Sequence, residues 1–96
     1  MSAYVLSVLN KTDRDVYEHY SEAGYLSILP YMPEVTVAES PEVIEGKFPG
    51  TTTIMMKFKS MEDAKAWYHS DLYQKAIPLR HAASDTSFVI MFPGAD

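Results

Sequence analysis

Four segments of the chain place apolar residues in the way that β-strands do. The clearest covers residues 51–58, where every second position is large and apolar: Ile54, Met56 and Phe58. Because successive side chains of a strand point to opposite faces, this period of two predicts a strand. The same pattern predicts three more strands, over residues 3–9, 34–40 and 87–92. Pro41 follows the second of these directly, which favours an edge position for residues 34–40.

The segment after the first strand has the spacing of a helix. Its apolar and aromatic residues recur every three or four positions, at Val16, Tyr17, Tyr20, Ala23 and Gly24. Thr12 and Asp15 fit the helix-capping pattern, and Asp13 is an alternative N-cap. Pro30 and Pro33 end the helix, because proline has no backbone N–H and a fixed φ.

A second helical region follows the third strand. Ser60 with Asp63 forms another capping pair and opens a helix that carries Met61, Ala64, Trp67 and Tyr68. Ser70 fits as the N-cap of a further helical piece, which we expect over residues 71–83. Pro78 lies inside that piece, so we expect it to kink the helix or to separate its last turn.

The predicted order is strand, helix, strand, strand, helix, strand, which is the α+β ferredoxin-like arrangement over a single domain, residues 1–96. Right-handed connections place both helices on one face of an antiparallel sheet. The strands are nevertheless apolar on both faces, as with Leu6 against Val5 and Ile90 against Val89. The helices can cover only one face, so a second copy of the sheet is the simplest cover for the other. We therefore expect a homodimer whose sheets pack face to face.

Composition narrows the class of protein. The 96 residues are 47% hydrophobic, carry a formal net charge of −5 and include no cysteine. The absence of cysteine excludes disulfides, thiolate catalysis and cysteine-ligated metal sites. The acidic balance argues against nucleic-acid binding, and no apolar run approaches the ~20 residues that span a bilayer. Residues 1–9 lack the features of a signal peptide, so we expect a cytoplasmic protein without a nucleic-acid or membrane partner.

Three stretches of the chain resemble one protein family. They are Asp13-x-x-x-Tyr17-x-x-Tyr20, the turn at residues 44–49, and residues 58–74 with Leu79-Arg80 beyond them. The long run is similar to the signature F-x-S-x-E-x-A-x-x-W-Y-x-S-x-x-Y-Q of the domain of unknown function 1330 family, in the dimeric α/β-barrel superfamily. The resemblance covers nearly the whole chain and implies a ferredoxin-like fold and a dimer. Superfamily members include cofactor-free monooxygenases, lactone isomerases, polyketide cyclases and haem-degrading enzymes.

The chain departs from that family in one loop. Members usually carry Gly-Gly-Arg or Gly-Gly-Lys between the first helix and the second strand, whereas residues 29–34 read Leu-Pro-Tyr-Met-Pro-Glu. The basic residue is missing, so the resemblance implies no anion-binding role for this loop.

Arg80 is one of two arginines and allows two interpretations. On a helix it shares a face with Tyr73 and Ile77. It could face a pocket and hold a substrate carboxylate or enolate oxygen, or it could form a structural ion pair with a carboxylate such as Glu45.

The histidines are candidates for acid–base chemistry, because imidazole titrates near neutral pH. His81, beside Arg80, is the better candidate, with His69 as a second, and we expect His19 to point to solvent. No pair of histidines has metal-ligand spacing, and no motif indicates a metal or another cofactor.

An unusual set of aromatic residues marks the helices: Tyr17, Tyr20, Tyr25, Tyr31, Trp67, Tyr68 and Tyr73. They either fill the core or line a pocket between helices and sheet. In the second case Tyr17, Tyr20, Trp67, Tyr73 and Arg80 would bind a ligand, and Arg80, His81 and Tyr20 would be the catalytic candidates.

The leading hypothesis is therefore a homodimer that binds a small molecule. Its catalytic form is a cofactor-independent enzyme of the isomerase, cyclase or dehydratase type that acts on a small oxygenated or aromatic compound. A non-catalytic metabolite-binding or dimerisation domain is the alternative. A haem-binding monooxygenase-like protein is the third, and it requires a histidine aimed into the pocket. The sequence leaves open whether the protein is an enzyme.

Overall fold

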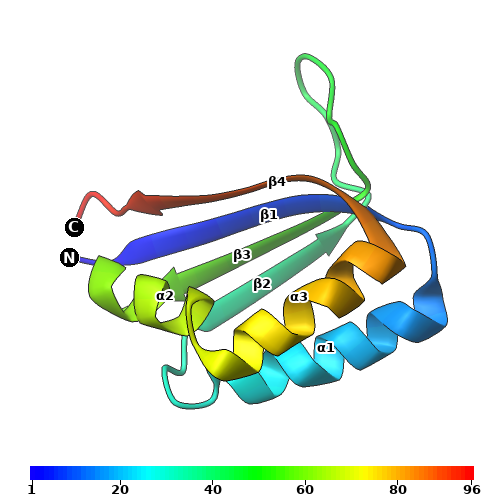
Figure 1. Ribbon diagram of the computed structural model, residues 1–96. Helices are drawn as coiled ribbons and strands as arrows, with labels where there is room; N and C mark the ends of the chain where they lie inside the picture. Colours follow the sequence, from blue (N-terminus) through cyan, green and yellow to red (C-terminus); the bar gives the residue numbers. More distant parts are fainter.

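The structure is a computed structural model that describes residues 1–96, and it contains one sheet and three helices (Figure 1). The strands are β1 (Ala3–Lys11), β2 (Glu34–Glu39), β3 (Thr52–Phe58) and β4 (Ser84–Pro93). The helices are α1 (Arg14–Ile28), α2 (Met61–Tyr68) and α3 (Asp71–Ala83). All strand pairs are antiparallel, in the order β2-β3-β1-β4, with the helices on one side of the sheet. This is the predicted ferredoxin-like α+β fold, and β2 is an edge strand as expected.

Short polar side chains cap the N-termini of the three helices. Ser60 Oγ accepts a hydrogen bond from the Asp63 N–H, and Ser70 Oγ accepts one from the Tyr73 N–H, so both predicted N-caps are confirmed. At α1 the cap is Asp13, whose Oδ1 accepts from the Val16 N–H at 3.1 Å. The pairing of Thr12 with Asp15 is therefore wrong, and Asp15 instead places a negative charge in the first turn of α1.

α3 has the predicted bounds, residues 71–83, but two details around its end differ from the prediction. The helix continues without a break through Pro78 to Ala83, so its last turn is not separated. β4 then begins at once at Ser84, three residues before the predicted start. The Ala83 carbonyl oxygen accepts from the Thr12 and Asp13 N–H groups at 2.8 and 3.0 Å. This contact with the β1–α1 turn satisfies a carbonyl that a helix end would otherwise leave unpaired.

The face of the sheet that meets the helices carries the core, and we call it the helix face. Val5 lies opposite Met56 on β3 and Met91 on β4, so the three share this face. The buried cluster that joins this face to α2 and α3 consists of Ala3, Val5, Met56, Phe58, Ala64, Trp67, Tyr73 and Ala76.

The opposite face of the sheet, the outer face, is also apolar. Leu6 lies opposite Met55 and Ile90, and the rings of Tyr4 and Phe92 stack with centroids 5.4 Å apart. No helix covers this face, and Ile90 remains 44% exposed. The expectation that the strands are apolar on both sides is therefore confirmed.

The loop between β2 and β3 rises on the side of the sheet away from the helices (Figure 1). It returns to the sheet at Gly50, where a Cβ atom would lie 2.8 Å from Val8 Cγ1 and 2.9 Å from the Leu9 carbonyl oxygen. Only glycine allows this close approach of the loop to β1.

Candidate functional site

A cavity of about 420 Å³ lies between α1 and the helix face, and it is the strongest candidate for a functional site. Twelve of its sixteen lining residues are hydrophobic. The sheet contributes Ser7, Val35, Val37, Ile54 and Met56. α1 contributes Tyr17, Tyr20, Ser21, Gly24, Tyr25 and Ile28, and the remaining residues are Leu29, Met32, Pro33, Trp67 and Tyr73. No charged side chain lines the cavity.

The cavity lies over β2, where the helices do not cover the sheet and where α1 carries a glycine. Val35 and Val37 belong to the helix face, since they lie opposite Met56 and Ile54, yet they are 46% and 56% exposed. The helices therefore leave this edge strand uncovered. Gly24 enlarges the space from α1, because a Cβ atom there would meet no atom within 4 Å. The sequence pattern of β2 shows the alternation but not the missing cover, so Val35 and Val37 were not among the predicted site residues.

Three polar side chains form a hydrogen-bonded chain that starts at Arg80, behind the cavity wall, and ends at two tyrosines that line the cavity. Arg80 Nη1 donates to Tyr73 Oη at 2.8 Å, and Tyr73 Oη lies 2.9 Å from Tyr20 Oη. Tyr20 and Tyr73 line the cavity, whereas Arg80 lies behind them, 5% exposed. α1 therefore supplies Tyr20, and α3 supplies Tyr73 and Arg80 at the helix spacing that the sequence predicts.

Arg80 is a buried cation without a carboxylate partner. The predicted alternative, an ion pair with Glu45, is wrong, because Glu45 lies exposed in the β2–β3 loop and the ion pair of the structure joins Lys11 to Glu39. The Arg80 guanidinium also lies near His81, with 3.5 Å between Nη2 and Nε2, and Arg80 Nε has no hydrogen-bond partner. Arg80 itself does not line the cavity, and its hydrogen bond to the cavity wall is the one to Tyr73.

Burial and hydrogen bonding fix the charge states of this chain of residues. Burial raises the pKa of Tyr73 well above its usual value, with the neighbouring Tyr20 adding to the effect. Burial opposes the charged form of Arg80, but the hydroxyl groups of Tyr73 and Tyr20 outweigh it and raise the pKa of Arg80. At neutral pH the site therefore holds a neutral Tyr73 hydroxyl against a charged guanidinium.

Trp67 contributes a buried indole ring to the wall of the cavity. Its ring centroid lies 4.1 Å from that of Tyr73, and its Nε1–H donates to Ser27 Oγ at 3.0 Å. Ser27 Oγ in turn donates to the Gly24 carbonyl oxygen. These bonds fix the indole against α1, so the wall is rigid and its buried polar atom is satisfied.

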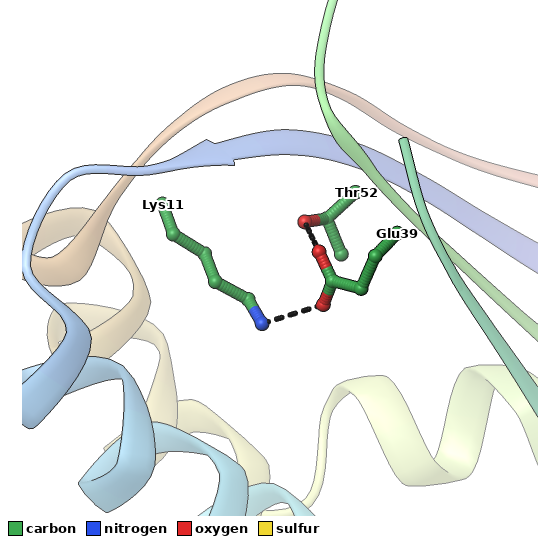
Figure 2. Close-up of polar contacts among 3 residues, drawn as sticks. All are labelled: Lys11, Glu39 and Thr52. Atoms are coloured by element: carbon green, nitrogen blue, oxygen red, sulfur yellow. Dashed lines mark hydrogen bonds and ion pairs between the residues drawn. The ribbon is translucent and has the colours of Figure 1, made fainter. Parts of the chain in front are cut away.

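A polar cluster lies beside Tyr17, one of the residues that line the cavity. Figure 2 shows Glu39 at the end of β2, which accepts from Lys11 Nζ and from Thr52 Oγ1, each at 2.7 Å. Lys11 Nζ also lies 4.4 Å from the centroid of the Tyr17 ring, within cation–π distance. The cluster thus joins the ends of three strands and holds the Tyr17 ring in place.

Most of the other predicted site residues lie outside the cavity. His81, His69 and His19 are exposed and none lines it. Tyr31 and Tyr68 pack against the core cluster instead, whereas Tyr25 lines the cavity.

No three His, Asp or Glu side chains lie close enough together to hold a metal ion, and no histidine lines the cavity, as haem binding there would require. No helix is long and apolar enough to cross a membrane.

Solved structures with the same fold agree with this architecture. A protein of unknown function from Rhodopseudomonas palustris is 12% identical, with a TM-score of 0.78 over 99% of this chain and 83% of that chain. A dimeric ferredoxin-like protein of unknown function from Jannaschia is 14% identical, with a TM-score of 0.73 over 98% and 100%. SnoaB, a cofactor-independent oxygenase from Streptomyces nogalater, is 6% identical, with a TM-score of 0.71 over 99% and 94%.

At the level of sequence, no curated protein matches the chain. The family described as a domain of unknown function, DUF1330, matches residues 2–93. That match covers every strand and helix of the fold and confirms the resemblance carried by residues 58–74. The chain therefore belongs to the DUF1330 family.

Proposed function

We propose that the chain is a homodimeric domain that binds one small, largely apolar, oxygenated molecule in the cavity of each subunit. The observation that carries this proposal is the cavity itself, which combines apolar walls with the hydroxyl groups of Tyr20 and Tyr73. Its volume of about 420 Å³ lies within the range of small-molecule sites. Apolar walls supply binding free energy, and a few fixed polar groups orient the ligand.

The glycine in α1 supports a binding role for the space. Gly24 lies inside a helix, where glycine costs about 0.5 to 1 kcal/mol relative to alanine. Nothing packs against Gly24, so close packing does not explain it. The cost is explained if the space that Gly24 leaves is occupied by a ligand.

We further propose that the bound molecule undergoes cofactor-independent proton transfer, of the isomerase, cyclase or dehydratase type. Tyr20 is the catalytic candidate because it lines the cavity and carries a hydroxyl group that can donate to a ligand oxygen. Arg80 is a positioning residue that acts through Tyr73. His81 has no contact with the cavity and is assigned no role. SnoaB is a precedent for cofactor-independent chemistry on this fold.

The dimer is proposed from the outer face. Leu6, Met55 and Ile90 lie side by side on it and no part of the helical layer covers them. Burying apolar area at about 25 cal/mol per Å² favours a second sheet as its cover. The Jannaschia neighbour is a dimer with the same fold. Light scattering should give twice the mass of one chain, and a monomer at micromolar concentration would contradict the dimer.

The ligand proposal is tested by filling the cavity from Gly24. Leucine at this position has room to extend into the cavity, whereas alanine adds only one carbon, so Gly24→Ala is the matched control. Naphthalene and 2-naphthol serve as probes, with the fluorescence of Trp67, the single tryptophan, as the signal. We expect saturable binding to the wild type and to Gly24→Ala, and binding at least tenfold weaker to Gly24→Leu. Equal binding to all three proteins would exclude the cavity as the site.

A further inference from the structure

We propose that Arg80, Tyr73 and Tyr20 form a one-way hydrogen-bond relay that ends in a donor hydroxyl inside the cavity, and that this donor selects ligands presenting a carbonyl, enolate or phenolate oxygen. The inference rests on the proposed function, because it names the ligand class for the same cavity. It differs from a direct guanidinium contact, in which Arg80 itself would touch the ligand.

The direction of the relay follows from its first bond. A guanidinium carries donors and no acceptor, so Tyr73 Oη must accept from Arg80 Nη1. Accepting a hydrogen bond from a cation polarises the Tyr73 O–H and makes it a better donor. The partner within reach is Tyr20 Oη, at 2.9 Å. When Tyr73 donates to Tyr20, the Tyr20 proton is left for the cavity.

The surroundings contain nothing that would neutralise this relay. Arg80 is 5% exposed and forms no ion pair, and no acidic side chain lines the cavity. A buried cation without a counter-charge is costly. A ligand oxygen with partial or full negative charge, placed at the Tyr20 hydroxyl, would compensate it through the two bonds of the relay.

The walls define the rest of the ligand. The Tyr20 hydroxyl lies on the side of the cavity that also carries Trp67 and Tyr73, whose rings are 4.1 Å apart, and Ile54 and Met56 face it from the sheet. An oxygen bound to Tyr20 therefore belongs to a molecule whose body is apolar, and an aromatic ring suits these walls. Ligands with only donor groups, such as ammonium compounds, would leave the relay unpaired and add a second positive charge.

A phenol without any other oxygen tests the relay. The probe is 3,4,5-trichlorophenol, and 1,2,3-trichlorobenzene is its counterpart without the hydroxyl. Binding is measured by calorimetry on either side of the pH at which the free phenol ionises. Because a hydrogen bond to a charged acceptor is worth about 1 kcal/mol more than one to a neutral acceptor, we expect the phenolate to bind about fivefold to tenfold tighter than the phenol.

Three conservative variants separate the relay from other effects. Tyr20→Phe removes the terminal donor, so the preference for the phenolate should disappear. Tyr73→Phe cuts the link to Arg80 but keeps the Tyr20 hydroxyl, so it should reduce the preference without removing it. Tyr68→Phe removes a hydroxyl from the same aromatic cluster outside the cavity and should keep the preference. Thermal unfolding verifies that each variant is folded.

The outcomes distinguish the two proposals. If trichlorobenzene and the phenol both fail to bind the wild type, the proposed function fails, and the relay proposal fails with it. If they bind but the phenolate has no advantage, or if Tyr20→Phe keeps that advantage, the relay is overturned while the cavity remains a binding site.

Discussion

The helix face and the outer face of the sheet are built from the same strands, and both are apolar, yet they differ in what covers them. On the helix face, Val5 and Phe58 are completely or almost completely buried by helices of the same chain. On the outer face, Phe88 and Ile90 keep 36% and 44% of their surface in water. The helix face is also incomplete over β2, and that gap is the cavity.

The difference separates two kinds of apolar surface in this chain, one covered by its own helices and one left uncovered. Surface that is covered by the chain itself stabilises the fold at every protein concentration. Surface that the chain leaves uncovered is available to something else, which we propose to be a second subunit on the outer face and a small molecule over β2. The predictions that follow test this division.

The largest effect is expected from a matched pair of phenylalanines, one on each face. Phe58 is 1% exposed and its ring lies 5.4 Å from that of Trp67, so Phe58→Ala should lower the free energy of unfolding by about 3 to 5 kcal/mol. Phe88→Ala should cost less, and its cost should depend on protein concentration because a subunit contact is lost. Urea unfolding at two protein concentrations measures the loss of unfolding free energy in each variant. Equal losses in the two variants would contradict the proposed difference between the two faces.

The next effect is a charge on the outer face. Ile90→Lys places a cation opposite Leu6, where the proposed partner sheet would bury it. We expect the dimer dissociation constant to rise at least about a hundredfold, which corresponds to about 2.7 kcal/mol. Leu72→Lys is the control, because Leu72 is an exposed apolar residue on α3, away from this face. Sedimentation measures the dissociation constant, and an unchanged dimer would place the interface elsewhere.

A smaller effect concerns pH and the helix side of the molecule. Burial raises the pKa of Tyr17 from 10.0 to about 12, with Tyr20 and Glu39 adding to the effect. A raised pKa means that this stabilisation is complete below pH 10 and is lost as pH rises to about 12, by up to about 2 to 3 kcal/mol. Urea unfolding across this interval should show a steeper loss for the wild type than for Tyr17→Phe, and identical slopes would contradict the assignment. Tyr73, whose pKa is also raised, adds to the loss in both proteins.

The features that the sequence could predict depend on interactions between residues that are close together in the chain. Ser60 and Ser70 cap helices through their own neighbours, and alternation identifies strands whatever packs on them. Helical spacing likewise placed Tyr73 and Arg80 on one face, and the structure joins them by a hydrogen bond. The choice between Thr12 and Asp13 as cap was open because both side chains suit that position.

The features that sequence missed depend on distant parts of the chain. The Ala83 carbonyl oxygen accepts from the N–H groups of Thr12 and Asp13, about seventy positions away, and no local signal marks that contact. Arg80 lacks the expected carboxylate because the fold places a tyrosine beside it. Val35 is exposed because the helices leave β2 uncovered, which alternation cannot reveal.

The smallest effect is expected at the polar margin of the helix face, where Glu39 accepts from Lys11 and Thr52 (Figure 2). These hydrogen bonds, that of Lys11 first, lower the pKa of Glu39 below its ordinary 4.5. A lowered pKa means that the stabilisation is present above pH 4.5 and is lost as pH falls through the lower value.

Glu39→Gln keeps the shape of the side chain and removes its charge. Because more than half of the Glu39 side chain is exposed, water and salt screen the pair, and the loss should be about 0.2 to 1 kcal/mol at neutral pH. The loss should shrink in high salt and should almost disappear when Lys11 is already methionine. A double-mutant cycle by urea unfolding measures this coupling. A loss that is unchanged in the Lys11→Met background would assign the role of Glu39 to its bond with Thr52, and the margin would then depend on hydrogen bonding within the sheet and not on charge.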